Sequence, residues 1–509
     1  MLFIVETGGE NVTKLQARAG WLSGTQIAVF CSIIAAVRVL VFAALFPLFN
    51  NVDERAHADL VLKYAHGEVP DQIERYSDES AHYFALYSTP EYFLDPKQEA
   101  YGQPVWTLPA DERERVIEAA TQAFHERANH ESGEPPLYYA IAGLWLNLGR
   151  ACHISGARLL YWVRFLNALI SAAIVWLGFF AARSFDDNRH LRFTVPLLLA
   201  LWSQTTFYSI TSDSLSPLSF GICFVGVVTL FNAKRPGFWL GAWIGVSLAT
   251  TCLTKTANLP LVLIVFLAVL LHVLKSQLPT KERSLTLAGF LVSAAIPLAI
   301  WFEWNRHQFG DLTATQSKIE LLGWTRKPLR EWWSHPVLTF QGAGEFWSQL
   351  IASFWRGEFI WHGHRLAWPV ADSFYWMTST AALIFAVTIL FTQKHNQANK
   401  RAVLLLATAS FLILIGFMLL LSIRFDFHSS PYPSREHPFF VSGRLLSAAA
   451  IPFFLVYGFA FERLVTAFKT NWTRPVALGA MIVFLILAQL ITNWPTFSSQ
   501  YNFFYTPAF

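Results

Sequence analysis

Two adjacent carboxylates, Asp53 and Glu54, follow directly after the first long apolar segment of the chain, and His57 stands one helical turn further on. Acidic side chains at the mouth of a membrane helix are costly unless they face water or a charged partner. In a helix, Asp53 and His57 share one stripe because positions i and i+4 nearly eclipse. An acid beside an imidazole has the residue types of general acid–base chemistry. The alternative interpretation is that both acids only cap the helix and mark the membrane boundary.

The residues around this pair carry the signals of a short helix. Asn51 is the expected N-cap, the acids stand in the first turn, where the helix dipole favours anions, and Gly67 is the expected stop. We therefore expect a helix lying on the membrane surface with the acid and the imidazole at its head. Side chains of neighbouring residues point about 100° apart on a helix, so only one of the two carboxylates can face a substrate squarely.

The composition indicates a polytopic membrane protein. Of 509 residues, 54% are hydrophobic and 14% are charged, and the apolar residues are spread over the whole length. The net charge of +4, divided among short loops, argues against nucleic acid as a partner. Cys31, Cys152, Cys223 and Cys252 lack the spacing of a zinc site or a disulfide framework and are interpreted as packing residues. Arg38, in the middle of the first apolar segment, requires a partner or a water-filled cleft.

Apolar segments divide the chain into loops and spans. The first segment is too long for the apolar core of a signal peptide and is expected to remain as an uncleaved span. We expect a cytoplasmic tail (1–23), a first membrane helix (24–50), an outer loop with surface helices (51–135) and a membrane core (136–303). An aromatic-rich outer loop (304–374), C-terminal membrane helices (375–493) and an outer tail (494–509) follow. Spans after the first are expected at about 160–183, 193–209, 214–231, 237–253, 258–275, 285–303, 375–392, 402–422, 444–462 and 476–493.

Basic residues recur in alternate loops, for example at Lys234 and Arg235 and again at Lys400 and Arg401. The positive-inside rule puts these loops in the cytoplasm. The N-terminus then lies in the cytoplasm, and the loops that hold the candidate chemistry lie outside the plasma (inner) membrane. The N-terminus and the basic loops can all lie in the cytoplasm only if one apolar segment does not cross the membrane. The short run 136–150 is the candidate for such a re-entrant or surface helix. The fold class is thus an all-α polytopic membrane protein with about 11 spans, in a range of 11 to 13.

The two large outer loops contain three further patterns. Residues 111–124 have apolar residues at helical spacing and predict a second surface helix, structural rather than catalytic. The tryptophans of 304–374 favour a belt at the membrane interface, although a few could stack on a sugar. His362 and His364, near Glu358, are metal-ligand types without a third spaced ligand. No metal site is assigned here, although a divalent cation could assist the reaction.

Residues 53–57 resemble the Asp-Glu-x-x-His motif of integral-membrane glycosyltransferases with the GT-C fold, which include the protein O-mannosyltransferases and the aminoarabinose lipid A transferases. Further motifs of that superfamily follow in the same order within residues 24–460, at Glu134–Tyr139, Arg164–Leu169, Ser212–Leu215, Leu253–Thr256, Trp304–Asp311 and Gly443–Leu445. Three positions depart from its pattern. Glu134 stands where a histidine is common before Pro-Pro, Leu445 replaces an aromatic residue, and Asn305-Arg306 reverses the commoner order.

The resemblance implies a GT-C-like helical bundle with its chemistry on the outer face. It implies Asp53 as the catalytic base, with Glu54 as its neighbour and either His57 or Asp213 as the group that orients it. No cofactor is implied with certainty. The expected partners are a polyprenyl-phosphate-linked sugar, a glycan, lipid or protein acceptor, and membrane lipids.

For the phosphate of the donor, the resemblance implies Lys255 and Arg444 as ligands, followed by Arg306. The alternative for Lys255 is a lysine that snorkels at the end of a span. A polyprenyl phosphate is already a good leaving group, so a general acid is dispensable, but its developing charge calls for cations in a dry cleft. The acceptor hydroxyl must lose a proton as it attacks, and displacement through an oxocarbenium-like state would invert the anomeric centre.

Two other classes of protein remain as alternatives. A lipid-linked oligosaccharide polymerase or ligase would also use lipid-linked sugars, but as diphosphates. A polytopic lipid or solute transporter should show two similar halves or helices broken at matching positions, and the sequence shows no such repeat.

Overall fold

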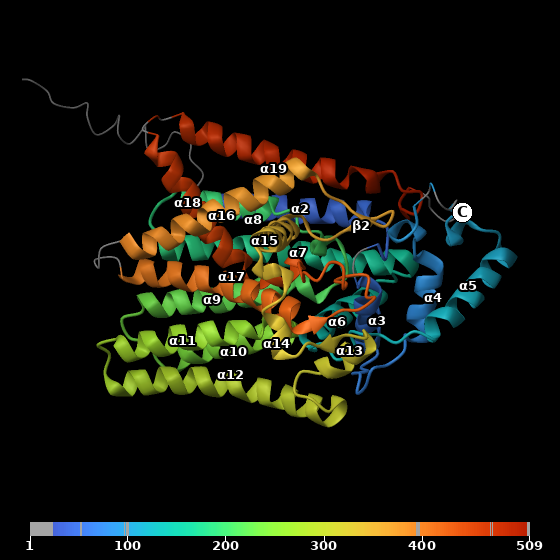
Figure 1. Ribbon diagram of the computed structural model, residues 1–509, viewed down its shortest axis with the longest axis horizontal. Coiled ribbons are helices and arrows are strands. Elements are labelled where there is room, and N and C mark those ends of the chain that lie inside the picture. The colour runs from blue at the N-terminus through green and yellow to red at the C-terminus, as the bar shows by residue number, and fades with distance from the viewer. Residues whose placement is uncertain are drawn as a thin grey trace, which may run out of the picture.

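The computed structural model describes residues 24–50, 53–95, 97, 101–392, 398–468, 470 and 472–505. The expected cytoplasmic tail and Asn51 lie outside these residues. Within them, long helices run side by side along the longest axis of the molecule, and shorter elements gather at one end, on the right in Figure 1. We call this the site end, because it carries the acidic motif that follows the first helix.

Nine helical segments in the described part of the chain are long and apolar enough to cross a membrane. They contain the helices α2 (Gly24–Leu45), α7 (Gly156–Phe185), α9 (Ser216–Asn232), α11 (Pro260–Lys275), α12 (Thr280–Phe309), α16 (Pro369–Thr392), α17 (Ala398–Arg424), α18 (Ala450–Ala467) and α19 (Thr473–Phe497). Two shorter apolar helices, α8 (Leu191–Leu201) and α10 (Phe238–Thr254), lie at the remaining expected positions. Each predicted span therefore coincides with an apolar helix, and the protein is an all-α, multi-pass integral membrane protein.

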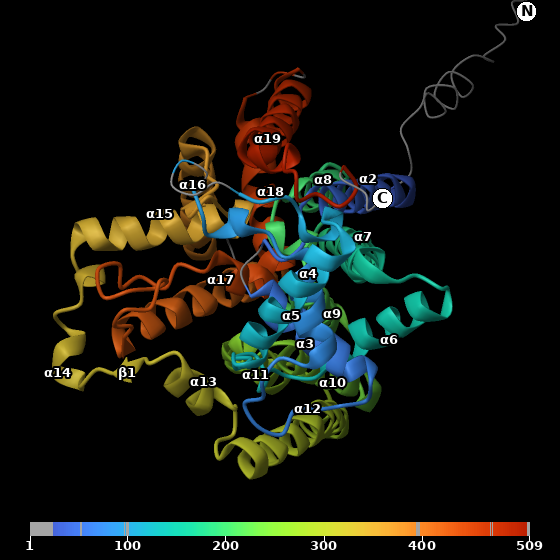
Figure 2. The same cartoon turned by 90° about the vertical axis from the view of Figure 1, so that its right-hand side faces the viewer.

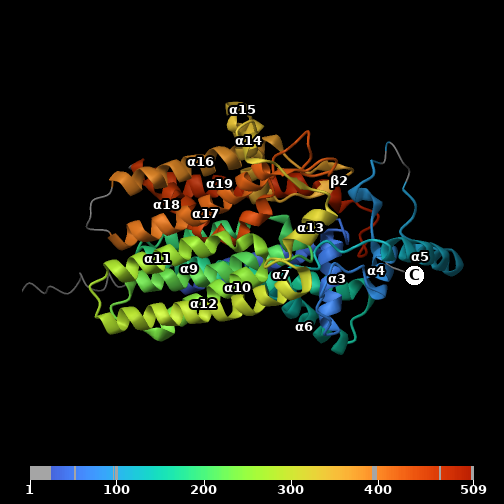
Figure 3. The ribbon, with the colours of Figure 1, turned by 60° about the horizontal axis from the view of Figure 1, so that its bottom comes forward.

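The site end is built from short elements that leave and re-enter the bundle. The helices there are α3 (Glu54–Ala65), α4 (Asp78–Tyr87), α5 (Ala110–His125), α6 (Leu137–Ala151) and α13 (Thr315–Leu321). Two more helices, α14 (Leu329–Trp332) and α15 (Phe340–Arg356), lie nearer the middle of the bundle in Figures 1 and 3. Two-residue strands form two antiparallel pairs, β1 (Thr325–Arg326) with β4 (Phe425–Asp426) and β2 (Ile360–Trp361) with β3 (His364–Arg365). Turns of 3-10 helix lie at Pro90–Tyr92, Val105–Thr107, Thr205–Tyr208, Ser212–Ser214, Thr256–Asn258, Pro336–Leu338 and Gly443–Ala449.

Both segments predicted as surface helices are helical, although most residues of α3 are buried. α3 stops two residues before Gly67, whose φ of 81° is the left-handed conformation expected at a helix end. α5 covers the predicted second helix and has no fully buried residue. The short run 136–150 forms α6, a 15-residue helix of about 22 Å. It lies against α3, where Asn147 Nδ2 donates to the carbonyl of Ala65 at 2.7 Å. Figure 3 shows α3 and α6 together at the site end.

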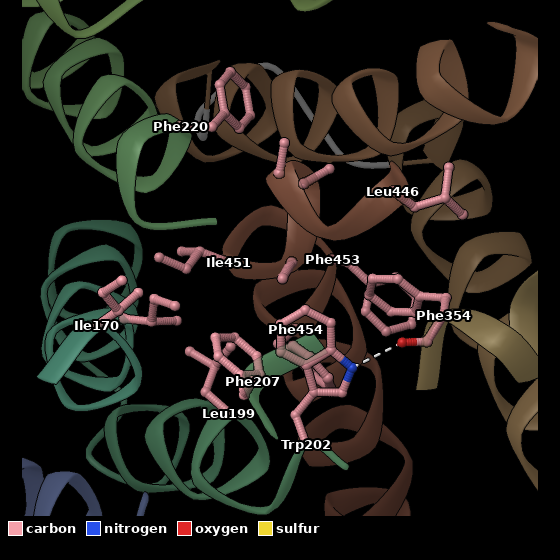
Figure 4. Packing of buried hydrophobic residues seen from close by; sticks show 14 of the residues in the cluster. Ile170, Leu199, Trp202, Phe207, Phe220, Phe354, Leu446, Ile451, Phe453 and Phe454 are labelled. Atoms are coloured by element: carbon pink, nitrogen blue, oxygen red, sulfur yellow. Dashed lines mark hydrogen bonds between the residues drawn. The ribbon is translucent and has the colours of Figure 1, made fainter. Parts of the chain in front are cut away.

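An aromatic core joins α8, α15 and α18 (Figure 4). Trp202, directly after α8, donates its indole N–H to the carbonyl of Phe354 at 2.9 Å and packs on Phe454. Next to it, Trp355 is fully buried and stacks on Tyr375. Trp355 is therefore a core residue, in contrast to the interface belt predicted for most tryptophans of this loop. This core fixes the C-terminal end of α15 beside the turn that begins at Gly443.

Polar residues of the apolar segments are only partly as expected. Arg38 has the predicted partner, since its Nη1 donates to the hydroxyl of Tyr208 at 2.5 Å. Cys31, Cys223 and Cys252 are buried, in agreement with a packing role. Cys152 is exposed instead, because it follows the end of α6 at the surface, and the prediction of a packing role was wrong for this residue.

Candidate active site

Residues far apart in sequence bring the predicted chemistry together at the site end. Asp53 is the N-cap of α3, Asp213 lies in the Ser212–Ser214 turn, Lys255 follows α10, and Arg444 lies in the Gly443–Ala449 turn. Asp53 has a φ of 61°, which is uncommon for a residue with a side chain and turns the chain sharply from α2 into α3. The site is thus assembled from loops held by the ends of membrane helices.

Arg444 is at the centre of this site. Its Nη2 lies 2.5 Å from Asp53 Oδ2 and its Nη1 lies 3.3 Å from Asp213 Oδ2, while Nε is 4.0 Å from Glu358 Oε2. Gly443 makes this position reachable, because a Cβ there would lie 2.0 Å from the backbone nitrogen of Phe354. The close approach of the two backbones therefore aims the guanidinium at three carboxylates.

Lys255 completes a chain of alternating charges. Its Nζ lies 2.9 Å from Asp213 Oδ1, and both side chains are almost fully buried. Asp213 is consequently shared between two cations, and its two oxygens are occupied by Lys255 and Arg444. This arrangement suits a residue that holds cations in place better than one that accepts a proton.

The group beside Asp53 is His130, which the sequence analysis did not identify. His130 Nε2 lies 3.2 Å from Asp53 Oδ1 and 3.3 Å from Glu131 Oε1. Burial acts to lower the pKa of His130, but its contacts with the two carboxylates outweigh burial and raise the pKa to about 9. An imidazolium therefore stands between the two acids at neutral pH. The one available signal was the pair His130-Glu131 shortly before the Glu134-Pro135-Pro136 motif.

These three residues also have the donor set of a cation site. One ligand atom from each of Asp53, His130 and Glu131 lies within 4.8 Å of the other two, and no other group of this kind occurs among the described residues. Carboxylate oxygens with one imidazole suit Mn²⁺, Mg²⁺ or Zn²⁺. Binding would displace the proton of His130, whose positive charge now occupies this place. We call these three residues the acidic triad.

Asp53 is ionised under all ordinary conditions. Burial acts to raise the pKa of its carboxyl group, but Arg444, and then His130, lower it far below the ordinary value. A carboxylate held in this way is a weak base, because taking a proton means giving up an ion pair. The basicity of Asp53 therefore depends on what Arg444 binds.

His57 does not touch Asp53, in contrast to the expectation that it could orient the base. Its Nδ1 lies 2.7 Å from the hydroxyl of Tyr139, and the side chain is fully buried. Burial lowers the pKa of His57 to about 3, so the ring is neutral. Its Nε2 is buried without a hydrogen-bond partner in the described structure. The predicted stripe fails because Asp53 caps α3 in a left-handed conformation instead of continuing the helix.

Glu54 is a structural residue in this arrangement. Arg164 binds it through two nitrogens, each at 2.7 Å, and the backbone N–H groups of Phe49 and Ile210 also donate to it, at 2.9 and 3.0 Å. Glu54 and Arg164 are almost fully buried. With its oxygens engaged, Glu54 ties the end of α2 to α7.

The remaining candidates lie elsewhere. Arg306 is 69% exposed near the end of α12, and its guanidinium is 3.9 Å from Glu303, so it does not join the other cations. Glu358 turns away from the two histidines and accepts a hydrogen bond from Ser442 at 2.7 Å, beside Arg444. His362, His364 and Glu358 therefore do not form the metal cluster considered from their sequence.

Similarity to solved structures is broad but distant. The apo oligosaccharyltransferase of Archaeoglobus fulgidus is 10% identical with a TM-score of 0.44, covering 92% of this chain and 55% of that protein. The same enzyme, tethered to an acceptor peptide with an NVT sequon, is 11% identical with a TM-score of 0.46, covering 95% of this chain and 55% of that protein. The arabinofuranosyltransferase AftD from Mycobacteria is 13% identical with a TM-score of 0.44, covering 95% of this chain and 27% of that protein. The chain thus spans about half of one protein and about a quarter of the other, and at these scores the likeness says nothing about the reaction.

Both of these proteins are glycosyltransferases by name, the class that the sequence motifs resemble. No curated protein matches the sequence. Residues 37–426, more than half of the chain, match the model of the family described as predicted membrane protein DUF2142, and the protein belongs to that family.

Proposed function

We propose that this protein is a membrane glycosyltransferase that moves a sugar from a polyprenyl-phosphate carrier to an acceptor, with inversion at the anomeric carbon. The observation that supports this most directly is the shared ion pair in which Arg444 binds both Asp53 and Asp213, with Lys255 behind Asp213. It places two buried cations beside an ionised carboxylate at the mouth of an apolar bundle. From the alternation of basic loops, we place this site on the outer face of the plasma membrane and the N-terminus in the cytoplasm.

The donor phosphate would bind at Arg444 and Lys255. A guanidinium presents paired N–H donors that match phosphate oxygens, and its charge would stabilise the leaving group as the glycosidic bond breaks. Arg444 is now engaged by carboxylates. A phosphate must therefore compete with Asp53 for it, which links the arrival of the donor to the state of the base.

Asp53 is the base in this proposal. When the phosphate takes over Arg444, the cation that depresses the pKa of Asp53 is partly neutralised, and the carboxylate becomes a better proton acceptor. His130 holds the other oxygen, Oδ1, so that Oδ2, which Arg444 releases, can face the acceptor. A positioned base of this kind contributes about a hundred- to ten-thousandfold in rate.

The bonds balance without a further reactant. The acceptor oxygen forms a bond to the anomeric carbon, the bond from that carbon to the phosphate oxygen breaks, and its electron pair leaves on the phosphate. The acceptor proton moves to Asp53. A divalent cation held by the acidic triad would add positive charge to the site, and while it bound Asp53 it would oppose proton transfer to that carboxylate.

The proposal can be tested with purified protein in proteoliposomes. Polyprenyl monophosphates and diphosphates carrying different sugars are supplied with a mixture of hydroxyl and amine acceptors, and release of the free carrier is measured. We expect release from a monophosphate donor, and a loss of at least about a hundredfold in Asp53→Asn, which keeps the shape but cannot accept a proton. Asp78→Asn is the matched control, because the Asp78 side chain is 97% exposed and lies outside the site.

Other outcomes would overturn the assignment. Release from diphosphate donors alone would favour a polymerase or ligase. Lipid or solute movement across the bilayer without release of a carrier would identify a transporter. Mass spectrometry of surface glycans from cells with and without the protein should then show which sugar is missing.

A further inference from the structure

A lysine from a distant loop reaches the acidic triad. Lys318, on α13, places its Nζ 2.7 Å from Glu131 Oε2 and 3.3 Å from Glu134 Oε1. Both carboxylates are at least nine-tenths buried. Each carboxylate oxygen of Glu131 therefore faces a positive group: Oε1 contacts His130 and Oε2 contacts Lys318. The ammonium therefore offsets part of the negative charge of Glu131 and Glu134.

The segment that carries Lys318 is a short helix between two glycines. Gly310 and Gly323 bracket it with φ values of 79° and 69°, backbone conformations that favour glycine and can serve as hinges. None of the residues of α13 is fully buried, so apolar contacts contribute little to holding it. Figure 2 shows α13 on the connection between α12 and β1, at the face that looks out from the site end.

The docked position is nevertheless specific. Ala314, in a left-handed conformation with a φ of 54°, packs directly on Gly133, where an added Cβ would lie 2.5 Å from the Ala314 Cβ. Gly133 lies between the two carboxylates that bind Lys318. A close backbone contact and a pair of buried ion pairs therefore hold the same short stretch, residues 131–134.

Two buried polar atoms could take a further partner. His57 Nε2 and Glu134 Oε2 have no hydrogen-bond partner, although both side chains are at least nine-tenths buried. Among the charged neighbours of His57, Glu131 does most to raise the pKa of its ring. Buried polar groups without partners are rare and call for an explanation such as a bound ion or ligand.

We propose that α13 is a strap that docks on the acidic triad through Lys318 and is released when a divalent cation binds there. This inference rests on the cation site described under the proposed function. A dication at Asp53, His130 and Glu131 would take up the charge of Glu131 and repel the ammonium of Lys318. By linkage, the docked strap weakens binding of the cation as much as the cation weakens docking. Lys318 is a positioning residue whose charge sets how readily the triad is loaded.

The first test is Mn²⁺ binding, measured by electron paramagnetic resonance on the full chain in nanodiscs. Removing the competing charge in Lys318→Met should tighten binding about fivefold or more, the lower end of typical coupling between two sites. Lys318→Arg keeps the charge and should bind as the wild type does. Lys281→Met, a charge removed from an exposed residue at the start of α12, is the matched control and should leave the affinity unchanged.

The second test is hydrogen exchange of the backbone amides of residues 311–322. Mn²⁺ should accelerate exchange in the wild type, whereas in Lys318→Met exchange should be fast already and insensitive to Mn²⁺. Equal Mn²⁺ affinity in the wild type and Lys318→Met, or no Mn²⁺ binding in either, would overturn the strap. Sugar transfer without this coupling would refute the strap alone, and coupling without any sugar transfer would refute the proposed function.

Discussion

The guanidinium of Arg444 meets the carboxylate of Asp53 at 2.5 Å across 391 residues of sequence. The two side chains are 13% and 20% exposed, so water screens the pair only in part. The candidate phosphate ligand and the candidate base are thus each other's counter-ion. A substrate that binds one of them must change the other.

Removing Arg444 should therefore expose the acid–base behaviour of Asp53. In Arg444→Gln the lost cation no longer depresses the pKa of Asp53, so the pKa rises. The residual turnover should then fall as the pH is lowered through this raised pKa, at a pH where the wild type keeps its activity. Turnover of the carrier phosphate between about pH 4.5 and 8, each profile normalised to its own maximum, measures this. Identical profiles for the two proteins would show that Arg444 does not control the base.

The Glu54–Arg164 pair should matter for stability and not for the chemical step. Glu54→Gln leaves a buried guanidinium partly unpaired, and breaking a buried pair costs about 3–5 kcal/mol. We expect a clear drop in the melting temperature in detergent, while the folded fraction retains carrier release. Asp426→Asn is the control, because its partner Arg435 is 65% exposed and an exposed pair contributes about 0–1 kcal/mol. A normal melting temperature for Glu54→Gln would contradict the structural role.

The spans, and the positions of four charged residues at their ends, were predictable because both depend on local sequence. An apolar run of about 20 residues can hardly be anything but a buried helix or a span, and the structure has an apolar helix at each such run. Asp53, Asp213, Lys255 and Arg444 were proposed from motif positions, each beside the end of an apolar run, and the fold brings these four together. A charged side chain at the end of a span either extends to water or pairs with another charge, and these four residues pair with one another.

The other residues of the site were not predictable from local sequence. His130 and Lys318 lie in outer loops, where charged residues are common and mostly solvated, and only the folded chain brings them to Glu131. Glu54 and Arg306 are the opposite case. Their motif positions suggested chemistry, but Glu54 is consumed by Arg164 within the core, and Arg306 lies at the exposed end of α12. Sequence spacing gives the direction of a side chain and not the partner that reaches it first.

His130 should make the stability of the protein depend on pH. Its pKa is about 9 in the folded protein and 6.5 in the unfolded reference, so protonation favours the fold. The stabilisation is complete below pH 6.5 and is lost as the pH rises through about 9. The melting temperature of the wild type should therefore exceed that of His130→Gln by more at pH 6 than at pH 9.5, as measured by thermal unfolding in detergent. A difference that does not change with pH would show that His130 is not charged in the fold.

The tip of the aromatic-rich loop should lie among lipids. Trp333 and Phe340 are 82% and 99% exposed, and Lys327 and Arg330 stand nearby in sequence. Figure 2 shows α14 and the start of α15 projecting sideways from the bundle. Aromatic side chains next to basic ones favour the membrane interface, because rings enter it while cations meet lipid phosphates.

Spin labels can place this tip relative to the bilayer. Labels on Trp333→Cys or Phe340→Cys should collide more often with oxygen than with a water-soluble nickel complex in proteoliposomes. The background must carry Cys152→Ser, because Cys152 is exposed and would also react. A label on Glu118→Cys, on the exposed face of α5, is the control and should favour the nickel complex. Nickel accessibility equal to that of the control at both tip positions would place this loop in water, and its tryptophan would then be available to stack on a sugar.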